Sequence, residues 1–346
     1  MFSLFSSLQR PSRTAVAAPV WAPEPPGWQA RDEAIMGTAI RVELWCDNAS
    51  RGQAAIDAVM AEMRRVDRAM SPHKVDSELS RINGYAAREA VPLSPEMFAL
   101  LQRAARFSEL SEGAFDISYA AVGRLYDYRR GIAPSAARLD AARALVDWRG
   151  VVLDASACSV RFARPGMCID LGGFAKGHAV DRATAILARM GIEHAHVAAG
   201  GDSRVIGDRR GRPWMIGIRD PRREDALVAT LPLVDTAIST SGDYERSFVG
   251  ADGVRHHHIV DPATGRSPDA VRSVTVLAAD GLTCEALSKT VFVQGVERGL
   301  ATIDKVPGAD AIVVDADGRL VCSSGMLAGG TPARQHTPHP CQGGST

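Results

Sequence analysis

The chain has 346 residues, and its 40 basic and 40 acidic side chains give a formal net charge of +0. Balanced charge, with no stripe of Lys and Arg among aromatic residues, argues against a nucleic-acid surface. The 46% apolar content is spread over short runs, none near the ~20 apolar residues that a membrane span requires. The length suits one large domain, or two intimate lobes, with a substantial core.

The first segment, residues 1–34, is rich in Ser, Pro and Ala. It lacks the continuous apolar stretch of a signal peptide, and no early Cys offers a site for a lipid. We therefore expect a flexible N-terminal segment and leave the compartment open. The six cysteines contain no C-x-x-C pair, which excludes the usual zinc and thioredoxin-like motifs.

The first predicted elements are a strand and two helices. Alternating apolar residues over 40–46 predict a half-buried strand. Apolar residues over 56–70 share one helical face, and Pro72 ends the pattern. Ser94 and Pro95 begin a second helix as N-cap and first helical residue. A short helix is then expected over 139–146, followed by strands at 151–153 and 159–162.

The next junction is the most informative one. Cys168–Leu171 reads as a strand, Gly172 and Gly173 break it, and a helix with an apolar face follows as far as Gly191. Free backbone N–H groups and the helix dipole at such a turn form a phosphate cradle, with Lys176 in the first helical turn. The competing interpretation is a tight turn in which glycine allows close packing. The local sequence leaves both open.

The second half of the chain is rich in strands. They are expected around 194–198, 213–218, 227–233, 236–240, 255–260, 272–278, 311–315 and 319–322, with helices at 283–293 and 296–304. Hairpin-like spacing predicts an α+β fold of mixed, largely antiparallel sheets with packed helices. Residues 327–346, which are rich in Gly, Pro and Thr, are predicted to form a disordered tail, which leaves 35–326 as the folded domain.

Three further motifs carry polar residues. Gly200-Gly201-Asp202 and Ser241-Gly242-Asp243 each follow a predicted strand. Either alone is more often a turn than a site, but several such turns could converge on a polyanion. In the run His256-His257-His258, adjacent strand residues point to opposite faces, so at most the first and third histidines could share a site. A buried, hydrogen-bonded histidine is the competing interpretation.

Taken together and in this order, the motifs resemble the ApbE family of FAD:protein FMN transferases. The similarity runs from about residue 35 to 325 through Met36-Gly37-Thr38, 70–83, 113–116, 170–177, 200–202, 241–246 and 257–265. The resemblance implies two intimate lobes with an FAD cleft between them. It also implies transfer of FMN from FAD to a Thr or Ser hydroxyl of an acceptor flavoprotein, release of AMP, Mg²⁺ on the pyrophosphate, and a location at the periplasmic face of the inner membrane.

The resemblance assigns roles to individual residues. It implies that His258 is the general base and that the carbonyl of Ala175 is a metal ligand. The positions implied to line the flavin or phosphate cleft are Met36, His73, Asp116, Asp170, Gly172, Gly173, Lys176, Gly201, Asp202, Ser241, Gly242 and Asp243.

One stretch departs from the family pattern. Where the family has Asp-Ala-Leu-Ser-Thr at its metal site, this chain has Glu285-Ala286-Leu287-Ser288-Lys289. Glu285 still offers a hard oxygen to magnesium, but protonated Lys289 cannot be a ligand. Either Lys289 takes over part of the metal's charge role, or metal affinity is low, or Ser288 or Thr290 replaces the missing ligand.

Two other functions remain open at this point. The same site could hydrolyse FAD to FMN and AMP, with water in place of the hydroxyl. Alternatively, the chain could be an FAD-binding protein with little turnover, which Lys289 favours.

Overall fold

The computed structural model describes residues 27–250 and 253–329. Its main feature is an eight-stranded sheet in which every neighbouring pair is antiparallel. The strand order is β1 (Trp28–Ile35), β2 (Thr38–Trp45), β6 (Ala195–Ala199), β7 (Asp202–Ile206), β10 (Ala237–Gly242), β13 (Val271–Ala278), β14 (Asp310–Asp315) and β15 (Leu320–Cys322). The predicted α+β class with a largely antiparallel sheet is confirmed.

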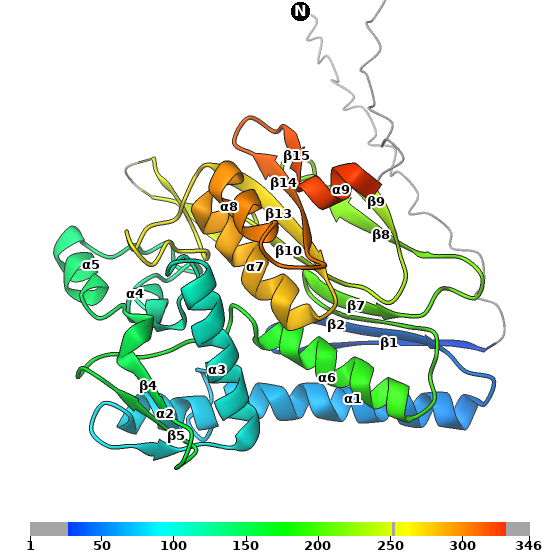
Figure 1. Ribbon diagram of the computed structural model, residues 1–346, viewed down its shortest axis with the longest axis horizontal. Helices are drawn as coiled ribbons and strands as arrows, with labels where there is room; N and C mark the ends of the chain where they lie inside the picture. The colour runs from blue at the N-terminus through cyan, green and yellow to red at the C-terminus, as the bar shows by residue number, and fades with distance from the viewer. Residues whose placement is uncertain (1–26, 251–252, 330–346) are drawn as a thin grey trace, which may run out of the picture.

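Three helices lie along one face of this sheet, namely α1 (Ala49–Met70), α6 (Ala175–Arg189) and α7 (Gly281–Gln294) (Figure 1). The apolar stripe of α1 predicted from the sequence is buried, as are Val42 and Leu44 of β2. Helix α8 (Val296–Ile303) packs on α7, and α9 (Ser324–Gly329) follows the last strand. Helix α7 is buried on nearly every side, so it presents its few polar side chains to the interior.

A hairpin of β8 (Trp214–Arg219) and β9 (Leu227–Leu233) covers part of the opposite face. Val205 of β7 and Ile238 of β10 pack with Trp214 of this hairpin. Successive strand residues alternate between faces, so Asp202 on β7 and Ser239 on β10 point instead toward the helices. That alternation places the polar residues of these strands beside α6 and α7.

The chain between α1 and α6 gathers at one side of the molecule (Figure 1). It contains α2 (Glu78–Tyr85), β3 (Val91–Pro92), α3 (Pro95–Leu110), the short helix η1 (Ile117–Tyr119), α4 (Ala120–Gly123), α5 (Ala136–Arg143), η2 (Trp148–Gly150), β4 (Val151–Asp154) and β5 (Ser159–Phe162). Strands β3, β5 and β4 form a small sheet, and β11 (Ser247–Val249) pairs with β12 (Arg255–His257) elsewhere.

The predicted strand at 168–171 is wrong. The segment joins no sheet, and the amide of Asn83 holds it instead. Ile169 N donates to Asn83 Oδ1 at 2.8 Å, and Asn83 Nδ2 donates back to the Ile169 carbonyl at 2.9 Å. An apolar run signals burial in an extended segment, but it does not show whether the backbone pairs with a strand or with a side chain.

The N-terminal expectation also needs correction, since residues 28–34 belong to β1, which pairs with β2 along its whole length. Strand β1 is an edge strand in which polar residues make up half of the sequence, and its apolar residues do not alternate regularly, so the apolar pattern did not reveal it. The predicted tail 327–346 begins too early, because residues 327–329 belong to α9. Residues 1–26 and 330–346 lie outside the described residues. The sequence also missed α2, β7 and β11, and it extended β12 beyond His257.

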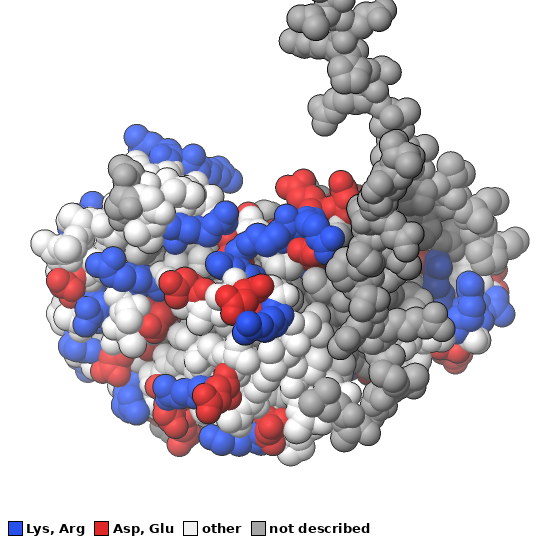
Figure 2. All heavy atoms as spheres, turned by 90° about the horizontal axis from the view of Figure 1, so that it is seen from above, with Lys and Arg blue, Asp and Glu red and all other residues white. Residues whose placement is uncertain are grey.

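Charged side chains of both signs are interspersed over the face seen in Figure 2. No helix within 27–250 or 253–329 is long and apolar enough to cross a membrane.

Candidate active site

A small pocket lies where the segment after β12, the start of η1, the turn before α6 and helix α7 meet. Its water-accessible volume is about 60 Å³, well below the ~300 Å³ or more of a typical ligand site. It is therefore too small for a whole dinucleotide. Six predicted site residues line it, and they come from distant parts of the chain: Asp116, Asp170, Gly172, Gly173, His258 and Lys289.

His258 is the strongest candidate for proton transfer. Its backbone N–H donates to the Arg246 carbonyl at 3.1 Å, and its buried Nδ1 has no hydrogen-bond partner among the described residues. Burial first, and then the positive charge of Lys289, lower the pKa of His258 to about 3. The imidazole is therefore neutral near pH 7, the form that accepts a proton.

The other two histidines of the run have different surroundings. His257 Nε2 lies 2.8 Å from the Pro268 carbonyl, and its ring meets the edge of Phe292. The ring of His256 packs between Tyr126 and Phe248. Of the three, His258 lines the pocket, so the structure does not bring two of these imidazoles together there.

Asp116 and Asp170 shape the pocket wall. Asp116 Oδ1 accepts from the backbone and hydroxyl of Ser118, both at 2.7 Å, and Oδ2 accepts from Trp148 N at 3.0 Å. Asp170 Oδ1 accepts from Gly172 N at 2.6 Å. Burial raises the pKa of both carboxyls despite these bonds. The Gly172 amide that the phosphate interpretation needs is thus already paired.

The predicted turn before α6 is present. Gly173 lies against the ring of Phe115, which a Cβ would approach to 3.3 Å, and α6 starts at Ala175. Glycine is therefore used for close packing, and the N-terminus of α6 follows immediately. The close-packing interpretation is supported for Gly173, and the phosphate interpretation stays a prediction.

A cluster of two buried carboxylates and two partly buried lysines lies beside the pocket. Lys176 Nζ is 2.5 Å from Asp202 Oδ2 and also contacts Glu285 Oε1. Glu285 Oε2 accepts from Gly177 N at 2.8 Å, and Lys289 Nζ is 3.4 Å from Glu285 Oε1. The cluster thus consists of two carboxylates and two ammonium groups.

Burial lowers the pKa of Lys176, but Asp202 and Glu285 outweigh it and raise the pKa above its ordinary value. Burial also raises the pKa of Asp202, yet Lys176 and Lys289 bring it below the ordinary range. For Lys289, burial prevails and its pKa is lowered. The pKa values of the two lysines therefore move in opposite directions.

Three serines continue the network. Asp202 Oδ1 accepts from Ser239 Oγ at 2.6 Å, and Ser288 Oγ lies 2.7 Å from Ser241 Oγ. Ser239 and Ser241 share the helix-facing side of β10 because they are two residues apart. The hydroxyl of Ser241, a residue predicted to bind cofactor, thus contacts Ser288 of α7.

Asp243 is paired with an arginine, and Gly201 and Gly242 lie where a side chain would clash. Arg222 binds Asp243 through two hydrogen bonds of 2.8 and 2.5 Å. A Cβ on Gly201 would come within 2.6 Å of the Thr240 carbonyl, and one on Gly242 would overlap the ring of Tyr244. None of Gly201, Gly242 and Asp243 lines the described pocket.

Met36 and His73 lie in two turns. Met36 (φ 58°) and Gly37 (φ 69°) form the two-residue turn between β1 and β2, a conformation that is unusual for methionine. Arg246 Nη2 lies 3.7 Å from where a Cβ on Gly37 would be. His73 is exposed, and its charge influences the carboxyl of Asp170.

Sequence reasoning missed Arg246 and Tyr119 as site residues. Tyr119 lines the pocket, and both Asp170 and burial raise its pKa. Arg246 acts electrostatically on Asp170 and His258. Arg246 belongs to the stretch 241–246 already singled out, but Tyr119 had no local signal.

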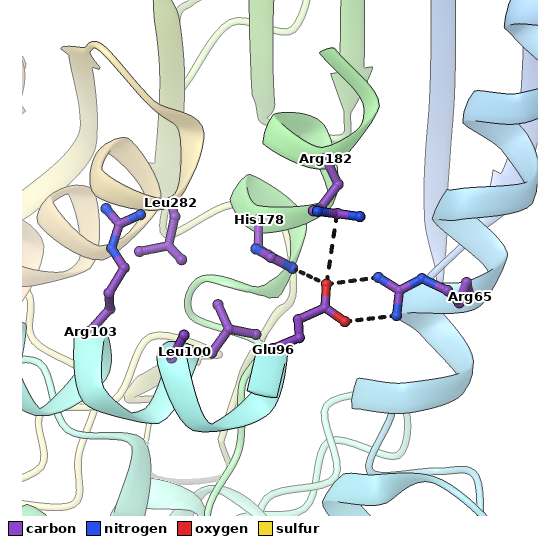
Figure 3. Close-up of a pocket in the computed structure, with 8 residues that line it drawn as sticks. Arg65, Glu96, Leu100, Arg103, His178, Arg182 and Leu282 are labelled. Atoms are coloured by element: carbon purple, nitrogen blue, oxygen red, sulfur yellow. Dashed lines mark hydrogen bonds and ion pairs between the residues drawn. The ribbon is translucent and has the colours of Figure 1, made fainter. Parts of the chain in front are cut away.

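A second, larger groove of about 530 Å³ lies between α1, α3, α6 and α7 (Figure 3). There, Glu96 binds Arg65 at 2.7 Å and His178 at 2.8 Å, and Arg182 approaches it as well. Arg103 pairs with Asp280 at 2.9 Å. None of the predicted site residues lines this groove. Glu62 of α1 also binds Arg65 and Arg182, so these ion pairs connect α1, α3 and α6.

The implied magnesium site does not fit the side chains present. Both carboxylate oxygens of Glu285 already interact with protein N–H donors, and Lys289 has no lone pair to offer when protonated. Within the described part of the chain, no group of three or more His, Cys, Asp or Glu side chains is placed to hold a metal ion.

Comparison with known proteins identifies the family. A sequence profile described as the ApbE family matches residues 36–313. A protein named FAD:protein FMN transferase from Treponema pallidum is 33% identical over 319 residues, covering 86% of this chain and 87% of that protein. One of the same name from Vibrio cholerae is 35% identical over 259 residues, covering 73% and 76%.

Comparison with solved structures indicates the same family. The ApbE protein of Thermotoga maritima superposes with a TM-score of 0.81 at 33% identity, covering 87% of this chain and 98% of that one. The flavin transferase ApbE of Vibrio cholerae gives 0.76 at 30% identity, covering 87% and 99%. The chain therefore belongs to the ApbE family. It is an enzyme of the transferase class, a FAD:protein FMN transferase.

Proposed function

We propose that the pocket at His258 is where the FMN half of FAD passes to a Thr or Ser hydroxyl of an acceptor flavoprotein. The hydroxyl oxygen forms a bond to the phosphorus of the FMN half, the anhydride bond to the AMP half breaks, and AMP leaves. His258 accepts the proton of the attacking hydroxyl. Such transfer depends mainly on positioning and on stabilising charge.

One observation carries this proposal, namely the neutral imidazole of His258 with an unpartnered Nδ1 in a pocket that also contains the ammonium of Lys289. An imidazole nitrogen that is free to accept a proton and a cation beside the diphosphate both favour hydroxyl attack. The remainder of FAD would extend beyond this small pocket toward Arg246, His73 and the Met36 turn, which suits the expected cleft between two lobes.

No step is assigned to Mg²⁺, because the side chains expected to bind it do not form a ligand set. Asp116 and Asp170 act as positioning residues, since their carboxylates hold the backbone of the pocket wall. The expected location at the periplasmic face of the inner membrane remains a prediction that fractionation and immunoblotting of the source cells would test.

The test is to co-express the chain with a fragment of a flavoprotein acceptor and measure the fragment's intact mass. We expect one added FMN on a Thr or Ser with the wild type. With His258→Ala we expect at least about a 10²-fold loss of transfer rate, because proton transfer acts mainly in the transition state. FAD affinity should change little.

His256→Ala is the matched control, because its ring packs among aromatic residues away from the pocket lining. FMN and AMP without an adduct would favour FAD hydrolysis. Retained FAD without AMP would favour a binding protein.

A further inference from the structure

Lysine is rare in this chain, and two lysines meet at one carboxylate. The 40 basic residues include only four lysines, Lys74, Lys176, Lys289 and Lys305, and the rest are arginines. Lys176 and Lys289 both contact Glu285 Oε1. An ammonium is a compact point charge with three donors, whereas a guanidinium is broad and planar. The basic groups beside Glu285 are therefore ammonium groups, which are closer in size to a metal ion than a guanidinium is.

The two ammonium groups have different roles in the cluster. Lys176 closely contacts both Asp202 and Glu285. Lys289 has a single hydrogen bond among the described residues, the long 3.4 Å contact with Glu285. Since an ammonium carries three donors, Lys289 keeps hydrogen-bonding capacity for a ligand.

Lys289 is also the member of the cluster that lines the pocket, together with His258. Only 18% of its side chain is exposed, and burial lowers its pKa. A buried cation with one weak partner is costly, and an anionic ligand would offset that cost.

We propose that Lys289 is the built-in cation of this site: its ammonium binds the diphosphate of FAD directly, and FAD binding requires no divalent metal at Glu285. This inference rests on the proposed function for the identity of the ligand. It goes beyond that function in assigning to this residue the charge that the family pattern would assign to a metal.

The charge balance of the cluster supports this assignment. Two lysines and two carboxylates sum to zero, so the site has no excess negative charge to attract a divalent cation. A metal ion beside Glu285 would face the ammonium of Lys289 at close range, and like charges a few ångströms apart repel by several kcal/mol even at an effective dielectric constant of ~20.

The experiment measures the dissociation constants of FAD and of riboflavin by flavin fluorescence, in excess EDTA and in excess Mg²⁺. The proteins are the wild type, Lys289→Met, Lys289→Gln and the control Lys305→Met, whose lysine is exposed on the surface. Riboflavin has no phosphate, so it separates the diphosphate contact from the flavin contact.

We expect wild-type FAD affinity to agree within about twofold in EDTA and Mg²⁺. Lys289→Met and Lys289→Gln should weaken FAD binding in EDTA by roughly 10- to 100-fold, the range of a hydrogen bond to a charged group. Riboflavin affinity should stay within about twofold throughout, and Lys305→Met should behave as the wild type.

The proposal is overturned if Mg²⁺ raises wild-type FAD affinity by about tenfold or more, or if both Lys289 variants bind FAD as the wild type does. The wild-type comparison involves no substitution, so it decides the matter even if a variant fails to fold. Absence of an FMN adduct would refute the proposed function and leave these binding results standing.

Discussion

At the scale of single residues, the site depends on how charges act on His258. Lys289, Arg246 and Lys176 all lower its pKa, after burial itself. The sequence could propose His258, Lys176 and Lys289, because each lies in a stretch that matches the pattern of the family or departs from it at a known position. Only the family resemblance singled out His258, because the strand pattern alone does not show which of the three adjacent rings the fold directs into the pocket.

We predict that FAD raises the pKa of His258 by at least about one unit, because the diphosphate offsets the nearby positive charges. NMR titration of the imidazole resonances, with His258→Gln to assign the signal, would measure the change. Riboflavin, which has no phosphate, is the control and should not raise the pKa of His258. An identical titration curve with FAD and with riboflavin would rule out the electrostatic coupling.

At the scale of elements, the charge cluster depends on the close approach of α6 and α7. A Cβ on Gly177 would overlap the carbonyl oxygen of Gly281, and both are backbone positions that side-chain rotation cannot relieve. The sequence predicted both helices, but it gave no indication that Gly177 is their contact point. Contacts between distant segments are not encoded in local periodicity.

Gly177→Ala should therefore reduce the free energy of unfolding by about 1–3 kcal/mol. It should also weaken FAD binding, because it moves Lys176 away from Glu285. Urea unfolding and FAD titration are the measurements. Gly84→Ala in α2 is the control, since a Cβ there meets nothing within 4 Å and alanine favours a helix by about 1 kcal/mol. Equal stability of the two variants would contradict the proposed helix contact.

At the scale of the whole molecule, buried histidines link stability to pH. Burial is the first cause that lowers the pKa of His258 to about 3 and that of His196 to about 4. Unfolding returns both to about 6.5. Between about pH 6.5 and 4 these two histidines bind up to two more protons in the unfolded chain than in the folded one, so their contribution to stability falls as the pH falls.

We predict a loss of at most about 2.7 kcal/mol per pH unit from these two groups over that window. Urea unfolding at pH 7, 6 and 5 would measure it, and His196→Gln should reduce the slope by up to half. The same pH dependence of the free energy of unfolding in the wild type and in His196→Gln would show that the fold does not keep His196 neutral.

The order of strands in the main sheet has a consequence for the newly made chain. Strand β2 ends at Trp45, but its partner β6 begins at Ala195, about 150 residues later. At a synthesis rate of ~5–20 residues per second, the inner edge of β2 stays unpaired for about 8–30 seconds before β6 is made. Unpaired edges invite association with other chains. The emerging N-terminal third of this enzyme should therefore bind chaperones on the ribosome until β6 emerges from the exit tunnel.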